Sequence, residues 1–249
     1  MTRAGRFRRY ELRTSDLEAA RAFYVEVLGT EFWGSDVSLI ALPERAAAQG
    51  APPHWLGHIA AADVAARREQ AAHQGAQPLG PVQRSSDGVE LAVLRDPFGA
   101  VLGLRGDAAS AAAPARASVA WHQLHTRDRE QALAWYGSLF GWSGRDVFEV
   151  DLGGEPGVAP GRDLGGLQTF AWDEVGPIVG AISNGARLPH IHPQWLFFFR
   201  VADLQIATAQ ARLHGGRILD PTQTARGDLI AGGEDPQGAA FGLFQSARE

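Results

Sequence analysis

The chain has 249 residues, of which 45% are hydrophobic and 20% are charged, a composition typical of globular chains with one or two domains. It contains no Cys, and all 23 basic residues are Arg, which excludes disulfides, cysteine zinc sites and lysine Schiff-base chemistry. A formal net charge of -5 argues against nucleic acid as a partner, and no apolar run is long enough for a membrane segment. We therefore expect a cytoplasmic protein without nucleic-acid or membrane partners.

The first elements in chain order are a strand followed by a helix. Residues 8–14 alternate in polarity as in a strand, and Asp16 offers an N-cap to a helix over 17–28 that Gly29 ends. Further elements of the first half are short strands at 31–34 and 37–42, a strand at 54–61, a helix from Asp63 to about His73 and a hairpin-like set of strands at 78–105.

Three motifs occur in the same order in both halves of the sequence, which indicates a tandem duplication. We predict one domain at 1–106, a linker rich in Ala, Ser and Pro at 107–118, and a second domain at 119–249. The matching segments are YELRTSDLEAARAFYVEVLG (10–29) with HQLHTRDREQALAWYGSLFG (122–141), PHWLGHIAAADV (53–64) with PQWLFFFRVADL (193–204), and DPFGAVLGL (96–104) with DPQGAAFGL (235–243).

The repeating unit is a strand, a helix and then short strands, twice in each half. No Gly-rich phosphate loop joins any strand to a helix, so the pattern predicts an α+β fold with curled, mostly antiparallel sheets. The second half is longer between its first two motifs, so we expect a truncated first module in the first half and the functional site in the second. Two Gly/Pro-rich segments of the second half, at 153–166 and 184–193, are candidates for loops that fold over a ligand.

The three motifs resemble those of the vicinal oxygen chelate superfamily, which includes glyoxalase I, extradiol dioxygenases, fosfomycin-resistance transferases and bleomycin-binding proteins. The resemblance covers nearly the whole chain and is greatest to two-domain glyoxalase-like proteins. It implies a tandem duplication of paired βαβββ modules whose sheets curl into half-barrel cups. Each cup would hold a small ligand and, in many members, one divalent metal.

The resemblance also implies where metal ligands would stand relative to the motif Asp residues. In members that bind metal, a His stands seven positions before the Asp of the first helix, another ligand seven positions before the Asp of the second helix, and a Glu seven positions after the Asp of the DPxG motif. None of the residues at these positions can bind a divalent metal, so we expect no metal cofactor. The six residues are Arg9, Leu56 and Gly103 in the first half and Trp121, Leu196 and Gly242 in the second.

His190 and His192 form a separate candidate metal site. With Glu149 or Asp151 they could chelate an ion, but flanking prolines also fit a surface loop, and the sequence leaves both interpretations open.

Residues two apart on a strand share a face, which defines the expected lining of the first cup. It contains Arg9, Glu11 and Arg13, with His58 from the strand at 54–61. The two Arg residues could bind a carboxylate, and Glu11 could serve as a general base. Alternatively, the three charges satisfy one another as an ion network.

The second cup is aromatic with a few polar groups. Trp121, Gln123 and His125 line it, with Phe198 and Arg200 from the strand after Pro193. A flat organic ligand could stack on Trp121 or Phe198 while the polar groups orient it, and His125 could transfer protons. The alternative is that the aromatic rings pack the core and His125 is structural.

Taken together, these residues favour a site that binds a small, flat organic molecule without a metal, with His125 and Glu11 as candidates for proton transfer or isomerisation. One alternative is a non-catalytic protein that sequesters its ligand, as the bleomycin-resistance relatives do. A second alternative is a divalent-metal-dependent lyase or dioxygenase with displaced ligands. The sequence leaves open whether the chain is an enzyme and whether it is a monomer or homodimer.

Overall fold

A computed structural model describes residues 5–34, 36–85, 88–106, 118–148, 166–224 and 226–247. The predicted linker at 107–118 lies outside these residues except for Ser118, and so do Glu149, Asp151 and the segment 153–165. Among the helices that are described, none is both long and apolar enough to cross a membrane.

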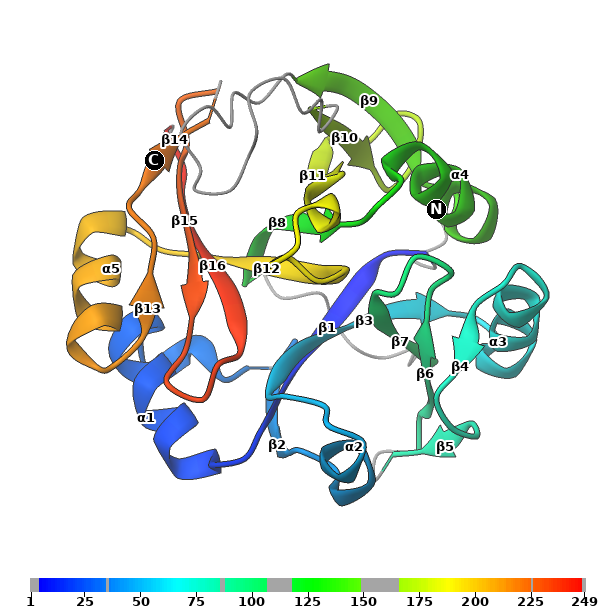
Figure 1. Cartoon of the computed structure of the whole chain (residues 1–249), viewed down its shortest axis with the longest axis horizontal. Coiled ribbons are helices and arrows are strands. Elements are labelled where there is room, and N and C mark those ends of the chain that lie inside the picture. The colour runs from blue at the N-terminus through cyan, green and yellow to red at the C-terminus, as the bar shows by residue number, and fades with distance from the viewer. Residues whose placement is uncertain are drawn as a thin grey trace. The chain divides into compact units, whose positions relative to one another are not determined.

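The described elements form four modules in chain order, each beginning with a strand and a helix (Figure 1). Module 1 contains β1 (Phe7–Thr14), α1 (Leu17–Leu28), β2 (Val37–Ala41) and α2 (Glu44–Ala48). Module 2 contains β3 (His54–Ala61), α3 (Val64–His73), β4 (Gln77–Pro78), β5 (Gln83–Arg84), β6 (Glu90–Arg95) and β7 (Val101–Gly106). Module 3 contains β8 (Val119–His125), α4 (Arg129–Phe140), β9 (Ser143–Phe148), β10 (Leu167–Ala171) and β11 (Ile178–Ser183). Module 4 contains β12 (Gln194–Arg200), α5 (Leu204–Leu213), β13 (Arg217–Ile218), β14 (Thr222–Gln223), β15 (Leu229–Glu234) and β16 (Ala240–Gln245).

Four aspartates start the four long helices. The side chains of Asp16, Asp63, Asp128 and Asp203 each accept a hydrogen bond from the backbone N–H three residues later, as N-caps do. At the other end of α4, Gly141 adopts φ 77°, a left-handed conformation that glycine reaches without strain. These caps set the helix boundaries, and the helices predicted at 17–28 and 63–73 are confirmed.

Module 1 is the shortest, because β2 is the one described strand that follows its long helix. The strand predicted at 31–34 is wrong: Thr30–Phe32 form a single 3-10 turn. The turn buries the ring of Phe32, whose centroid lies 5.0 Å from that of Phe199 and 5.8 Å from that of Tyr24. Burial of the Phe32 ring therefore decides the conformation of this segment. The alternation of polar and apolar residues, from which the strand was predicted, does not decide it.

The strands belong to two sheets, one from each half of the sequence. The first has the order β2-β1-β3-β7-β6-β4 with β5 beside β6, and the second β13-β15-β16-β12-β8-β11-β10-β9 with β14 beside β15. In each module the first strand pairs in parallel with the last, and the later strands pair antiparallel. The predicted α+β fold with two curled half-barrel sheets is confirmed.

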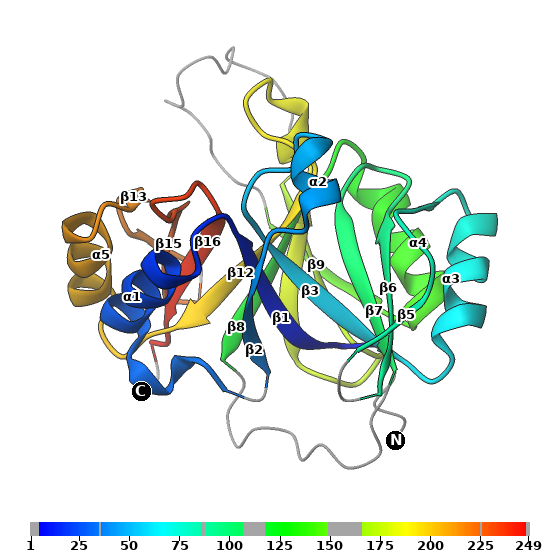
Figure 2. The ribbon, with the colours of Figure 1, turned by 90° about the horizontal axis from the view of Figure 1, so that it is seen from below.

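The chain divides into two compact units that cut across the halves of the sequence. In unit 1 helix α3 packs against α4, and in unit 2 helix α1 packs against α5, as both views show (Figure 1, Figure 2). Unit 1 comprises 1–7, 58–110 and 122–195, and unit 2 comprises 8–57, 111–121 and 196–249. Modules 2 and 3 therefore share one core, and modules 1 and 4 share the other.

In unit 2, a chain of buried hydrogen bonds joins Trp55 at the start of β3 to Tyr24 of module 1 and Asp235 of module 4. Trp55 Nε1 donates to the Tyr24 hydroxyl at 2.8 Å, and this hydroxyl donates to Asp235 Oδ2 at 3.2 Å. The other oxygen of Asp235 accepts the backbone N–H groups of Gln237 and Ala239. Burial raises the pKa of the Asp235 carboxyl group, and these hydrogen bonds oppose that rise.

The same arrangement recurs in unit 1, where it joins Trp195 at the start of β12 to Tyr136 of module 3 and Asp96 of module 2. Trp195 Nε1 donates to the Tyr136 hydroxyl at 3.0 Å, which donates to Asp96 Oδ2 at 2.8 Å. Asp96 Oδ1 accepts the N–H groups of Phe98 and Ala100. The Tyr, Trp and Asp residues that repeat in the three sequence motifs thus form two structural Trp–Tyr–Asp chains.

Candidate functional site

One position that the resemblance assigns to a metal-binding Glu is filled by a neighbouring ring. Gly103 of β7 lies opposite His58 of β3, and a Cβ atom on Gly103 would collide with the His58 imidazole. His58 itself is buried, with 1% of its surface exposed. A longer side chain at 103 would have to displace this imidazole.

The second half shows the same substitution with a different ring. Gly242 of β16 lies opposite Phe198 of β12, and a Cβ atom on Gly242 would collide with the Phe198 ring. The remaining assigned positions hold Arg9, Leu56, Trp121 and Leu196, and the described residues include no group of three His, Cys, Asp or Glu that could hold a metal. Among the described residues, none of these six positions holds a side chain that ligates a divalent metal.

Strand β1 presents its charged residues on one face. Tyr10, Leu12 and Thr14 are buried, whereas the alternating Glu11 and Arg13, like Arg9, lie on the opposite and less buried face. Arg13 Nε donates to Glu11 Oε1 at 2.8 Å, and the two side chains are 15% and 12% exposed. Glu11 is thus held by a charge-assisted hydrogen bond, which it would have to give up to act as a general base.

Two further polar residues lie beside this ion pair, and the sequence did not single them out. Ser38 of β2 is the register partner of Glu11. His54 begins β3, and its ring is close enough for the charges of Arg13 and Glu11 to act on it. His54 Nδ1 lies 2.8 Å from the Pro52 carbonyl, which can only accept, so Nδ1 carries the proton. Burial lowers the pKa of His54, which favours the neutral ring.

In the second half, Trp121, Gln123 and His125 alternate along β8, as expected for residues on one face. His125 ends the strand opposite Ser183 of β11, and its Nδ1 lies 3.0 Å from Ser183 Oγ. Burial lowers the pKa of His125 to about 4, so the imidazole is neutral at pH 7. None of the described residues forms a hydrogen bond with Nε2, the other ring nitrogen.

The turn after β11 fixes the geometry of this pair. The Gly185 N–H donates to Ser183 Oγ at 3.3 Å, and a Cβ atom on Gly185 would come within 2.6 Å of His125 Nδ1. Gly185 therefore lets the imidazole approach the backbone closely. No short sequence pattern marks Ser183, because its importance follows from a pairing across 58 residues.

The remaining predicted residues have more ordinary surroundings. Phe198 packs on Gly242, and the Arg200 guanidinium lies 5.8 Å from the Phe244 ring centroid. Gln123 is buried. Trp121, Phe198 and Arg200 belong to unit 2, whereas Gln123 and His125 belong to unit 1.

His190 and His192 are both exposed, and their expected partners Glu149 and Asp151 lie outside the described residues. Their metal role stays a prediction.

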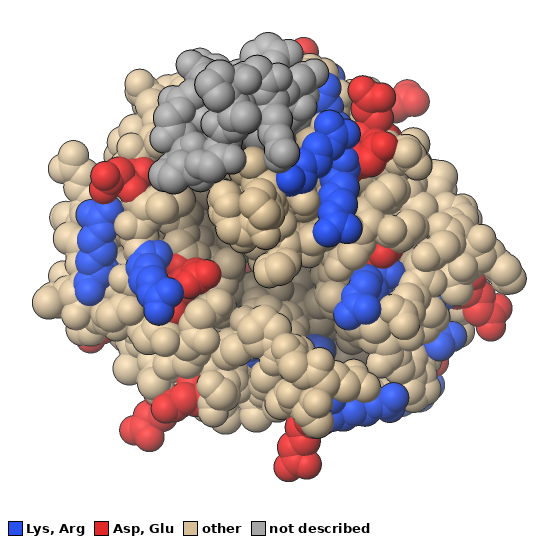
Figure 3. Space-filling view, in the orientation of Figure 1, with Lys and Arg blue, Asp and Glu red and all other residues tan. Residues whose placement is uncertain are grey.

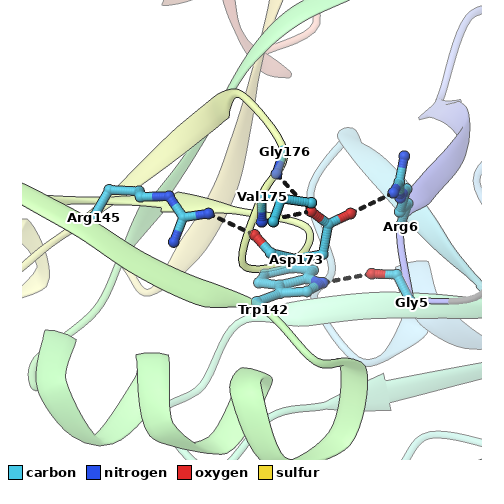
Figure 4. Close-up of polar contacts among 7 residues, drawn as sticks. All are labelled: Gly5, Arg6, Trp142, Arg145, Asp173, Val175 and Gly176. Carbon is cyan, nitrogen blue, oxygen red and sulfur yellow. Dashed lines mark hydrogen bonds and ion pairs between the residues drawn. The ribbon is translucent and has the colours of Figure 1, made fainter.

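A polar cluster around Asp173 fixes the turn between β10 and β11 in unit 1 (Figure 4). Asp173 Oδ2 pairs with Arg6 Nη2 at 2.6 Å, while Oδ1 accepts the N–H groups of Val175 and Gly176. Arg145 donates to the Asp173 carbonyl at 2.7 Å. The hydrogen bond from Gly176 is the main reason that the pKa of Asp173 is lowered. The cluster holds the hairpin whose second strand ends at Ser183.

Charged side chains on the face drawn in Figure 3 occur singly or in small groups of mixed sign. The described residues visible there form no continuous basic patch of the kind that binds phosphate backbones. The expectation that nucleic acid is not a partner stays a prediction.

Comparisons with known proteins give consistent results. The model of the Glyoxalase/Bleomycin resistance protein/Dioxygenase superfamily matches residues 118–243. The CFP32 proteins of Mycobacterium bovis and Mycobacterium tuberculosis, named as glyoxylases, are 26% identical over 261 residues, which covers 95% of this chain and 93% of theirs.

Two solved structures share the fold. The Mn(II)-bound glyoxalase from Novosphingobium aromaticivorans is similar with a TM-score of 0.63 at 15% identity, covering 98% of this chain and 83% of that one. A catechol 2,3-dioxygenase is similar with a TM-score of 0.59 at 15% identity, covering 99% of this chain and 90% of that one.

The matched region spans half of the sequence and contains the second copy of all three repeated motifs. It also contains Tyr136 and Trp195 of one Trp–Tyr–Asp chain and Asp235 of the other. The chain therefore belongs to the Glyoxalase/Bleomycin resistance protein/Dioxygenase superfamily.

Proposed function

We propose that this protein binds a small organic molecule at His125, without a divalent metal. The neutral imidazole would donate a hydrogen bond to a carbonyl oxygen, or take a proton from an enol hydroxyl or from the carbon next to a carbonyl group. The observation that carries the proposal is the His125–Ser183 hydrogen bond of 3.0 Å in a buried setting that lowers the pKa of His125 to about 4. A ring that is neutral at pH 7 can both donate and accept a proton.

Ser183 and Gly185 support this role by orienting the imidazole. Because Ser183 Oγ accepts the Gly185 N–H, the hydroxyl proton of Ser183 is available for His125 Nδ1. In that arrangement Nδ1 accepts a hydrogen bond, so the single proton of the neutral ring is on Nε2. The Nε2–H group can then polarise a carbonyl oxygen of the ligand. If Nδ1 is protonated instead, Nε2 is a base. In both arrangements the atom that acts on the ligand is Nε2, which forms no hydrogen bond with a described residue.

The two ring-filled glycine positions support the metal-free part of the proposal. Gly103 and Gly242 stand where the resemblance implies Glu ligands, and His58 and Phe198 occupy the adjacent space. A divalent metal such as the Mn(II) named for the Novosphingobium structure would receive no side-chain ligand from these two positions. Here an imidazole would polarise the ligand, a role that a Lewis acid fills in metal enzymes.

The proposal is tested with metal-depleted protein and a panel of dicarbonyl and flat aromatic compounds, followed by tryptophan fluorescence and proton-exchange assays. We expect saturable binding that added Mn(II), Zn(II) or Ni(II) leaves unchanged, and at least tenfold weaker binding or turnover in His125→Gln. The matched control is His190→Gln, because His190 is exposed.

Binding that is unchanged in His125→Gln, or that requires one equivalent of metal, would overturn the proposal. If binding is lost in His125→Gln but no proton exchange occurs in the wild type, the protein sequesters its ligand without catalysis.

A further inference from the structure

We infer a second ligand site in unit 2, at which the Arg13 guanidinium and the Ser38 hydroxyl bind a small carboxylate beside Glu11. The site, here called the carboxylate site, consists of Arg13, Glu11 and Ser38. It is distinct from the proposed site at His125, because its residues belong to β1 and β2 of module 1.

Arg13 has N–H groups that form no hydrogen bond with a described residue. Its Nε is used by Glu11, at 2.8 Å, and no described residue accepts a hydrogen bond from its two terminal nitrogens. A guanidinium that uses one donor for a neighbouring carboxylate keeps a pair of parallel N–H groups, the geometry that binds a second carboxylate in bidentate fashion. With 15% of the side chain exposed, Arg13 is accessible yet largely desolvated, which strengthens such a bond.

Ser38 supplies an unsatisfied hydroxyl on the same side of the sheet. Its Oγ is sequestered from solvent and has no hydrogen-bond partner among the described residues. Ser38 is the register partner of Glu11 in the parallel β1–β2 pair, so the two side chains point to the same face, and Arg13 lies diagonally across. A buried hydroxyl without a partner is costly unless a ligand or water completes it.

The charge of this face suits a monoanion. Arg9, Glu11 and Arg13 alternate on β1 and sum to one positive charge. His54 adds none in its neutral form, which its burial favours. These three residues carry one net positive charge, which the carboxylate of a small organic acid would balance. Ile40 stands opposite Arg13 in the register, so an apolar group lies next to the guanidinium for the carbon part of the ligand.

The test uses acetate and pyruvate as probes, with acetamide as the uncharged isostere of acetate, in the full-length protein by calorimetry or ligand-detected NMR. We expect saturable binding of both anions and none of acetamide. Ser38→Ala should bind acetate about tenfold more weakly. Glu11→Gln should bind acetate more tightly, because it removes the competing carboxylate.

Two further variants distinguish loss of the carboxylate site from loss of the folded structure. The double variant with Glu11→Gln and Arg13→Gln removes both charges together, so neither is left buried and unpaired, and it should lose acetate binding while remaining folded. The control Arg84→Gln breaks an exposed Arg–Glu pair, with side chains 70% and 42% exposed, and should bind acetate as the wild type does.

Wild-type acetate affinity in Ser38→Ala and in the folded double variant would overturn the inference. His125→Gln separates the two sites: it should leave acetate binding unchanged, whereas loss of acetate binding in that variant would place the anion at His125 and overturn the carboxylate site.

Discussion

In unit 1 the phenol oxygen of Tyr136 accepts a hydrogen bond from Trp195 and donates one to Asp96, all three residues being buried. Its counterpart Tyr24 does the same for Trp55 and Asp235 in unit 2. Burial raises the pKa of both tyrosines well above the usual value, so both hydroxyls keep their protons. The repeated motifs thus hold the modules together, whereas the two proposed sites use residues that differ between the halves.

We predict that Tyr136→Phe lowers the free energy of unfolding by about 2 to 4 kcal/mol, because it removes one donor from buried Asp96 and the acceptor of Trp195. Urea denaturation followed by tryptophan fluorescence measures the change. Ser138→Ala, which deletes an exposed hydrogen bond to Gln74, serves as the control and should change stability much less. Equal midpoints for Tyr136→Phe and the wild type would contradict the structural role of the chain.

At the scale of elements, the β10–β11 hairpin depends on its turn. Asp173 joins this turn to Arg6 near the start of β1, and Trp142 Nε1 donates to the nearby Gly5 carbonyl (Figure 4). Inside unit 1, these bonds tie Gly5 and Arg6, which precede β1, to Trp142 after α4 and to the turn of the hairpin. The hairpin in turn carries Ser183 to His125.

We predict that Asp173→Ala speeds amide hydrogen exchange at Val175 and Gly176 and through the turn, because both N–H groups lose their acceptor. Mass spectrometry of peptides from residues 172–184 measures it, and peptides from α4 should be unaffected. Asp220→Ala, which removes a 95% exposed carboxylate from an ion pair with Arg212, is the control. Exchange that is unchanged in the turn would show that its backbone conformation does not need Asp173.

At the scale of the whole molecule, buried histidines couple stability to pH. Burial lowers the pKa of both His122 and His125 to about 4, below the usual value of 6.5. The unfolded chain therefore binds protons at a higher pH than the folded one. The stability that these rings contribute is complete above about pH 6.5 and is lost as the pH falls toward 4. The raised pKa values of Asp96 and Asp235 act in the opposite sense, because protonation of a buried carboxyl group favours the folded state.

We predict that the free energy of unfolding falls between about pH 7 and pH 5, by about 2 kcal/mol for each of the two rings before the opposing effect of the carboxyl groups. His125→Gln should flatten this dependence by about half. Urea denaturation at a series of pH values measures the slope. The same slope in His125→Gln and wild type would mean that His125 is not desolvated in the folded state.

Much of the fold could be predicted because its signals are local. Asp16 and Asp63 cap helices, Gly29 ends one, and alternation places Glu11 and Arg13 on one face of a strand. The grouping of modules could not be predicted, because it depends on contacts such as Tyr24 with Asp235 that span 211 residues.

The candidate sites divide in the same way. His54 could have been found, because it alternates with Leu56 and His58 along β3. Ser38 and Ser183 could not, because each acquires its neighbours through strand register.

The interleaving of the two units also determines the order in which they can form during synthesis. Unit 1 draws its last segment from residues up to Trp195, so its core can close while module 4 is still being translated. Unit 2 needs residues 8–57 together with 196–249, so Tyr24 is translated 211 residues before its partner Asp235. Module 1 is therefore synthesised well before module 4, and the aromatic face of α1 stays exposed until Phe241 has been translated and can cover it.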